Sequence, residues 1–224
     1  MDAKARNILR LIFRTSLNQN KPYGSLCTKE HYDVAKVIGD ESIVLLRNNG
    51  ILPLQADKYN RILVVGDNAV RRLTDGGGSS ELKPKDMISP LDALRALYGD
   101  KIEYTQGYAC GRPFFGHEEE MQQTVIDSLR AEAVAKARQA DVVIYVGGLN
   151  KNAFQDCEST DRKSYNLPFS QNELIEELVA VNPNLVIANI SGNAYAMPWL
   201  KKVPAILHLS LIHISEPTRP EPIS

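Results

Sequence analysis

The sequence is short of cysteine, of net charge and of long apolar runs, and each shortage excludes a class of protein. Its three cysteines, Cys27, Cys110 and Cys157, have no metal-ligand spacing, and their odd number argues against a complete disulfide framework. The formal net charge is −1 and no basic run occurs, so we expect no nucleic acid and no membrane as a partner. No apolar run approaches the roughly 20 residues that span a bilayer.

Metal-binding and nucleotide-binding patterns are also missing. His31, His117 and His208 show no metal-ligand spacing. The glycine-rich stretch at 64–80, VVGDNAVRRLTDGGGSS, has neither the Gly-Lys-Ser/Thr of a Walker loop nor a GxGxxG at a strand-to-helix turn. We therefore expect no metal and no cofactor.

What the sequence does contain is an alternation of short apolar runs with helical patterns. This alternation predicts an α/β fold with a mostly parallel sheet flanked by helices. Ser89 is predicted to cap one helix, and Ser170 with Glu173 to form a capping box at another. The predicted strands are 62–66, 102–107, 142–146, 185–191 and the start of one more at 204–207, and the predicted helices between them are 89–97, 118–140 and 170–181.

The N-terminal part has a different character. Residues 2–17 have the apolar spacing of an amphipathic helix, and 18–28 are polar and linker-like. A second helix is predicted from about residue 30 to 47, where Asn48-Asn49-Gly50 provides a stop signal. Its last turns, SIVLLRN, are nearly all apolar, so we expect them to be buried.

Two loops after predicted strands could carry chemistry. The three glycines at 76–78 would let backbone N–H groups approach an anion or sugar hydroxyls, although the residues alone slightly favour a merely flexible loop. The second loop follows the strand at 142–146 and contains Glu158, with Asp161 and Arg162 close by. A lone carboxylate in a loop is usually solvated, but the end of a buried strand and charged neighbours favour a functional role for Glu158.

Three other residues have simpler interpretations. Cys157 has no nearby histidine to activate it, so a structural thiol is favoured over a nucleophile. Trp199, the only tryptophan, is interpreted as a packing residue rather than a sugar-stacking platform. Asn189 begins a glycosylation sequon but lies in an apolar strand, so the sequon is discounted.

Seven motifs occur along the chain in this order: ESIVLLRNNGILPL, ILVVGDNA, DGGGSS, ADVVIYVGG, ESTDR, LPFSQNELI and SGNAYAMPWL. Taken together, they resemble the C-terminal α/β-sandwich domain of glycoside hydrolase family 3, in its β-glucosidase-like branch. The resemblance covers roughly 29–208, and it rests on the order and spacing of all seven. Residues 1–17 are similar to the last helix of the family's N-terminal (β/α)8 barrel, and 18–28 to its interdomain linker.

The resemblance implies a function and a set of site residues. Family members are retaining exo-acting β-glycosidases, so a terminal β-glucoside or oligosaccharide is the implied substrate. Glu158 matches the general acid/base, Ser79 or Ser80 would face the sugar subsite, and Asp161 and Arg162 would brace the acid/base loop. The nucleophilic aspartate would belong to a barrel domain absent from these residues, which makes that barrel the implied partner and leaves the chain alone inactive. Relatives are often secreted or periplasmic.

The last sixteen residues do not belong to the alternation of strands and helices. The stretch at 209–219, LSLIHISEPTR, resembles the translation of a transposase-type sequencing adapter, so we expect the natural sequence to stop near His208 and the sheet to be truncated at its C-terminal end. The alternative is a genuine proline-rich tail. For function, the alternatives are a stand-alone flavodoxin-like module that binds a small ligand without catalysis, and a structural module with degenerate sites.

Overall fold

The computed structural model describes residues 2–20, 24–71, 84, 87–110, 121–157 and 160–210. The chain divides into two units, Met1–Asp40 and Glu41–Ser224. The N-terminal unit contains helix α1 (Asp2–Arg14) and most of helix α2 (Lys29–Ser42). None of the residues in these two helices is buried, so the N-terminal unit has no core of its own.

The C-terminal unit is built on one sheet with the strand order β1-β6-β5-β4-β2-β3. All neighbouring strands in this sheet are parallel except β1, which runs antiparallel to β6. The α/β fold with a mostly parallel sheet is therefore confirmed. The strands are β1 (Val44–Asn48), β2 (Ile62–Val65), β3 (Ile102–Thr105), β4 (Val142–Gly148), β5 (Leu185–Ile190) and β6 (Ala205–Leu209).

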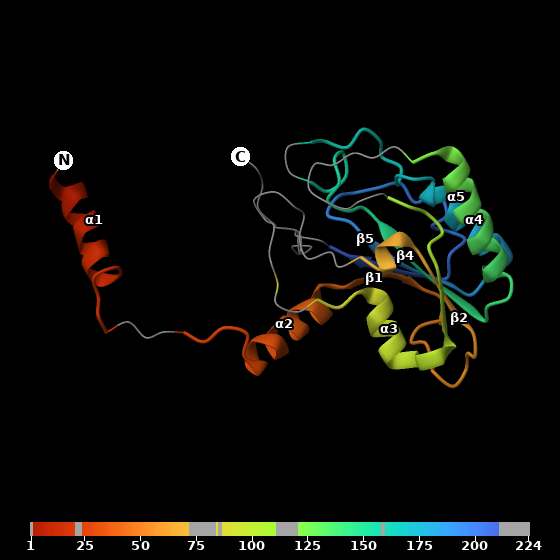
Figure 1. Cartoon of the computed structure of the whole chain (residues 1–224), viewed down its shortest axis with the longest axis horizontal. Coiled ribbons are helices and arrows are strands. Elements are labelled where there is room, and N and C mark those ends of the chain that lie inside the picture. Colours follow the sequence, from red (N-terminus) through yellow and green to blue (C-terminus); the bar gives the residue numbers. More distant parts are fainter. Residues whose placement is uncertain are drawn as a thin grey trace. The chain divides into compact units, whose positions relative to one another are not determined.

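Helices cover the two faces of this sheet unequally. Successive side chains of a strand point to opposite faces, so Leu63 and Val65 of β2 join one core while Ile62 and Val64 join the other. Helices α4 (Gln123–Ala137) and α5 (Gln171–Val181) cover the first face, and α3 (Pro90–Tyr98) lies on the second (Figure 1). Two short 3-10 helices, η1 (Asp67–Ala69) and η3 (Gly99–Lys101), complete the described helices.

The second face also contains an apolar groove of about 610 Å³. It extends over β1, β4, β5 and β6 beside α3, and Leu45, Ile144, Val186 and Leu207 are among its lining residues. The first face is more completely filled: Trp199 is fully buried there, and its Nε1–H donates to Asn172 Oδ1 at 2.9 Å. The interpretation of Trp199 as a packing residue is confirmed.

The second helix predicted from the sequence is wrong in its last turns. Helix α2 ends at Ser42, and β1 begins at Val44. Its apolar residues are also not buried as expected: Leu45 is 51% exposed and Leu46 47%. Pairing with β6 supplies the backbone hydrogen bonds of this segment, so tertiary contact overrides the helical pattern read from the sequence.

The two predicted helix caps have different outcomes. Ser89 accepts from Asp92 N–H at 3.1 Å and Asp92 reciprocates, so Ser89 caps α3 in a full capping box. Ser170 does precede α5, but it adopts a left-handed conformation with φ 53° and makes no side-chain cap bond. The predicted capping box at Ser170 is therefore wrong. A capping serine needs extended backbone to turn its hydroxyl toward the free N–H groups of the helix.

Candidate active site

The carboxyl ends of the parallel strands bring the loops of interest to one edge of the sheet. Two glycines allow neighbouring backbone segments to approach each other closely there. A Cβ on Gly66, at φ 135°, would lie 1.9 Å from Val146 O, and one on Gly148, at φ 113°, would lie 2.0 Å from Ile190 O. Only glycine fits these positions, so the ends of β2, β4 and β5 are held against one another where their loops begin.

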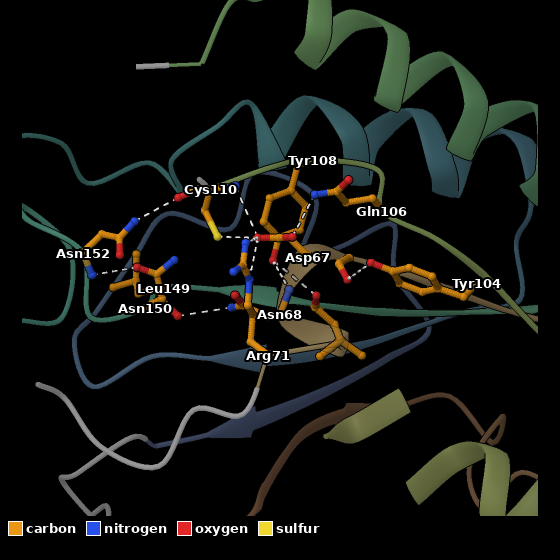
Figure 2. A network of polar contacts seen from close by, with 12 residues as sticks. Asp67, Asn68, Arg71, Tyr104, Gln106, Tyr108, Cys110, Leu149, Asn150 and Asn152 are labelled. Atoms are coloured by element: carbon orange, nitrogen blue, oxygen red, sulfur yellow. Dashed lines mark hydrogen bonds and ion pairs between the residues drawn. The ribbon is translucent and has the colours of Figure 1, made fainter. Parts of the chain in front are cut away.

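A buried carboxylate organises the loop that follows β2. Asp67 is only 2% exposed, and its Oδ2 accepts from Arg71 Nη2 at 2.6 Å and from Cys110 Sγ at 2.5 Å (Figure 2). Its Oδ1 accepts from Gln106 Nε2 at 2.9 Å. We call Asp67, Arg71, Gln106 and Cys110 the Asp67 cluster. Burial and the adjacent Asp67 carboxylate raise the pKa of the Cys110 thiol, which therefore acts as a hydrogen-bond donor and not as a nucleophile.

Further hydrogen bonds join the Asp67 cluster to the loops of β3 and β4. Asn68 donates from its backbone N–H to Tyr108 Oη at 3.2 Å and from Nδ2 to Leu149 O at 3.2 Å. Asn152 Nδ2 donates to Cys110 O at 2.9 Å (Figure 2). Burial raises the pKa of Tyr108 well above its ordinary value, so its hydroxyl keeps the proton that it donates to Val146 O. Three strand ends are thus joined in one network.

The loop between β4 and α5 (residues 149–170, the β4–α5 loop) is anchored at both of its ends. Gln171, the first residue of α5, is fully buried, donates to Gly148 O at 2.9 Å and accepts from Gly148 N–H at 2.8 Å. Within the loop, Phe154 N–H donates to Thr160 Oγ1 at 3.0 Å. The same hydroxyl lies 2.8 Å from Cys157 Sγ, which places this partly buried thiol in a local polar contact. Side-chain hydrogen bonds therefore fix the backbone at both ends of this loop and at Phe154.

Two charged residues of the β4–α5 loop bind the segment that follows β5. Asp156 is 9% exposed, and its carboxylate accepts from Gly192 N–H at 2.5 Å and from Asn193 Nδ2 at 2.5 Å. Arg162 donates to Ala194 O through Nη1 and to Ser164 O through Nη2, the latter at 2.9 Å. Asp156 and Arg162 stand on either side of 158–159 in sequence, and both contact residues 192–194.

A polar pocket of about 410 Å³ lies between these two segments. Most of its lining residues belong to the β4–α5 loop, including Cys157, Thr160, Asp161 and Arg162. The others are Asn193 and Ala194, which follow β5. Burial lowers the pKa of His208 on β6, and the charge of Asp156 acts in the opposite direction. The pocket is a concave surface lined by polar side chains, which can orient a polar ligand.

The structure describes some of the predicted site residues and not others. Glu158, Ser79 and Ser80 lie outside the described residues. Asp161 is exposed and lines the pocket, and Arg162 makes the loop contacts just given. Asn189 is fully buried within β5, which supports discounting the sequon.

Sequence reasoning missed Asp67 and gave no role to Asp156. For Asp67 a signal was present, because it comes directly after a buried strand and Arg71 follows four residues later, within ion-pair distance.

Among the described residues no cluster of three or more histidine, cysteine or acidic side chains could hold a metal ion. Nor is any described helix both long and apolar enough to cross a membrane.

Several known proteins are similar to this chain in sequence. A model of the glycosyl hydrolase family 3 C-terminal domain matches residues 43–212. The chain is 55% identical over 210 residues to the beta-glucosidase BoGH3A of Bacteroides ovatus, covering 91% of this chain and 28% of that protein. It is 30% identical over 221 residues to an exo-alpha-(1->6)-L-arabinopyranosidase of Bifidobacterium breve, covering 95% of this chain and 28% of that protein.

A solved structure gives the same result in three dimensions. The beta-glucosidase of Bifidobacterium adolescentis matches with a TM-score of 0.73 at 30% identity, over 92% of this chain and 28% of that one. The chain therefore spans 28% of the length of these relatives. The resemblance carried by the seven motifs is confirmed, and the chain belongs to glycosyl hydrolase family 3, of which it contains the C-terminal domain.

Proposed function

We propose that this chain is part of a retaining exo-β-glycosidase of the β-glucosidase type, which removes terminal non-reducing β-linked sugars. The observation that carries the proposal is the 55% identity to a beta-glucosidase across 91% of the chain. The β4–α5 loop, which carries Glu158, fits this role because it leaves the carboxyl end of a buried strand and flanks a polar pocket.

In the proposed reaction Glu158 acts twice. It first protonates the glycosidic oxygen while an aspartate nucleophile attacks the anomeric carbon, and it then removes a proton from the water that hydrolyses the glycosyl-enzyme. Retention of configuration needs the two carboxyl groups about 5–5.5 Å apart. The nucleophile would come from an N-terminal barrel domain, which the remaining length of the relatives can accommodate. Residues 1–17 would be the last helix of that barrel, and 18–28 the linker.

The other predicted residues have supporting roles in this proposal. Ser79 or Ser80 would contact the sugar in the subsite that holds the non-reducing end. Asp161 and Arg162 would brace the loop of Glu158, and the bonds of Arg162 to Ala194 and Ser164 support this for Arg162. Ser159 stands where the family usually has glycine, so the backbone next to Glu158 is less permissive here.

The experiment uses the full-length protein that contains this chain. Wild type and Glu158→Gln are assayed on p-nitrophenyl β-glucoside and β-xyloside, with Glu173→Gln, an exposed position on α5, as the matched control. We expect Glu158→Gln to lower turnover about 10²–10⁴-fold, the usual contribution of a general acid/base, and azide to restore part of it with activated substrates. Unchanged activity in Glu158→Gln would instead indicate a structural module with a degenerate site. A stand-alone ligand-binding module is not favoured by the similarity found.

A further inference from the structure

We propose that Asp156 is a positioning residue for Glu158. It would hold the N-terminal flank of the acid/base position against residues 192–194, while Arg162 holds the C-terminal flank against the same segment. This inference rests on the proposed function, because it explains how the acid/base would be placed. Nothing in the family resemblance assigned a role to Asp156.

The Asp156 carboxylate has the geometry of an anchor. Both oxygens are used, Oδ2 by Gly192 N–H and Oδ1 by Asn193 Nδ2, each at 2.5 Å. The backbone of Asp156 is fixed as well, because its N–H donates to Asn150 O at 2.9 Å. Hydrogen bonds to an ionised acceptor are shorter and about twice as strong as neutral ones. Asp156 therefore has little freedom to move relative to the residues after β5.

The segment that receives these bonds is itself fixed. Ser191, which follows β5 directly, is fully buried. The Ser191 hydroxyl donates to Asn193 O at 2.5 Å and accepts from Asn193 N–H at 3.2 Å. Since β5 is an interior strand of the sheet, residues 191–194 extend the rigid core to the edge where the β4–α5 loop lies. A loop attached to this segment takes its position from the core.

The two attachments lie close to Glu158 in sequence, one on each side of it. Asp156 precedes Glu158 by two residues and Arg162 follows it by four, so a chain of at most about 3.6 Å per residue links each attachment to the acid/base. A general acid must reach the leaving oxygen within about 2.6–3.2 Å. A displacement of about 1 Å can cost roughly 100-fold in rate. Losing one attachment should therefore impair proton transfer more than substrate binding.

The test separates positioning of the acid from a general effect on the fold. In the full-length protein, Asp156→Asn and Asn193→Ala are compared with wild type on aryl β-glucosides whose leaving groups differ in pKa. Phenolates of high pKa need protonation as they leave, whereas 2,4-dinitrophenolate does not. We expect kcat/KM to fall about 10–100-fold for the poorest leaving groups in Asp156→Asn, with little change for the 2,4-dinitrophenyl substrate. Asn193→Ala should show the same trend more weakly, because the bond to Gly192 survives.

Each remaining outcome is also decisive. Asp127→Asn, which removes an exposed carboxylate on α4, serves as the matched control and should leave the leaving-group dependence unchanged. An equal loss on all substrates, or no loss at all, would overturn the inference. If Asp156→Asn does not fold, Asn193→Ala alone decides by the same criterion. If Glu158→Gln shows the steep leaving-group dependence and the Asp156 and Asn193 variants do not, only this inference fails; if Glu158→Gln shows no loss, the proposed function fails.

Discussion

Asp67 and Asp156 are both buried carboxylates at the carboxyl edge of the same sheet, but their charges are compensated in different ways. Asp67 follows β2 and has the Arg71 guanidinium at 2.6 Å. Asp156 lies in the β4–α5 loop, and the partners described for its carboxylate are a backbone N–H and a side-chain amide. One charge is neutralised by a cation and the other is solvated by dipoles.

This difference predicts different consequences when each carboxylate is removed. A buried ion pair is strongly destabilised when one partner is removed, because the other charge loses its compensation. A carboxylate held by neutral donors leaves only unsatisfied donors when it is removed, which costs less. The Asp67 cluster should therefore govern the stability of the domain, whereas Asp156 should influence stability modestly and catalysis strongly.

The largest effect is expected for Asp67→Ala. The substitution removes the carboxylate that accepts from Arg71, Gln106 and Cys110 together. Because the Arg71 side chain is still 20% exposed, we expect the low end of the range for a broken buried pair, a decrease of about 3 kcal/mol in the free energy of unfolding. Urea denaturation of the chain measures it.

A double substitution shows whether the charge of Arg71 causes this loss. In Asp67→Asn/Arg71→Met neither charge remains, so the double variant should be more stable than Asp67→Ala. If Asp67→Ala costs less than about 1 kcal/mol, the Asp67 cluster does not hold the strand ends together and the comparison with Asp156 loses its basis.

A smaller loss of stability is expected for Asp156→Ala. Gly192 N–H and Asn193 Nδ2 lose their acceptor, but the Asn193 side chain is exposed and water can replace one bond. The free energy of unfolding should fall by about 1–2 kcal/mol, clearly less than for Asp67→Ala. Asn193→Ala is the matched control and should cost less again. A loss as large as that of Asp67→Ala would mean that Asp156 is mainly structural.

The sequence predicts the layout of the sheet better than the contacts at its edge. Apolar runs such as 142–146 and the Ser89 cap are local signals, and the structure confirms both. The sequence predicts helix for the segment after Ser42 because its apolar residues fit either pattern, and only pairing with β6 decides between them. Long-range contacts leave no local signal.

The two aspartates illustrate that limit. The ion pair of Asp67 with Arg71 spans four residues and could have been inferred from their spacing, but the Cys110 thiol comes from 43 residues away. The partners of Asp156 lie 36 and 37 residues away, after the next strand. The charged loop could be recognised from its composition, but what holds it in place depends on which strand lies next to β4.

The smallest effect is a pH dependence that only the Asp67 cluster should show. Burial and the Asp67 carboxylate raise the pKa of Cys110 in the folded chain, whereas an unfolded thiol ionises near pH 8.5. A raised folded pKa means that the folded state holds its proton longer, so this stabilisation is complete below about pH 8.5 and is lost as the pH rises above it. Tyr108, whose pKa is also raised, adds to the loss only from about pH 10.

Cys110→Ser should remove this alkaline loss, because a hydroxyl can still donate to Asp67 but does not ionise in this range. Urea denaturation at pH 7 to 9.5 should show wild type losing about 1 kcal/mol more than Cys110→Ser over that interval. Asp156→Asn should lose as much as wild type, because the Asp156 carboxylate accepts from an amide and a backbone N–H, which do not titrate there. Parallel curves for wild type and Cys110→Ser would show that the thiol is not held protonated by Asp67. In that case the hydrogen bond from Cys110 to Asp67 would not distinguish the Asp67 cluster from Asp156 in its response to pH.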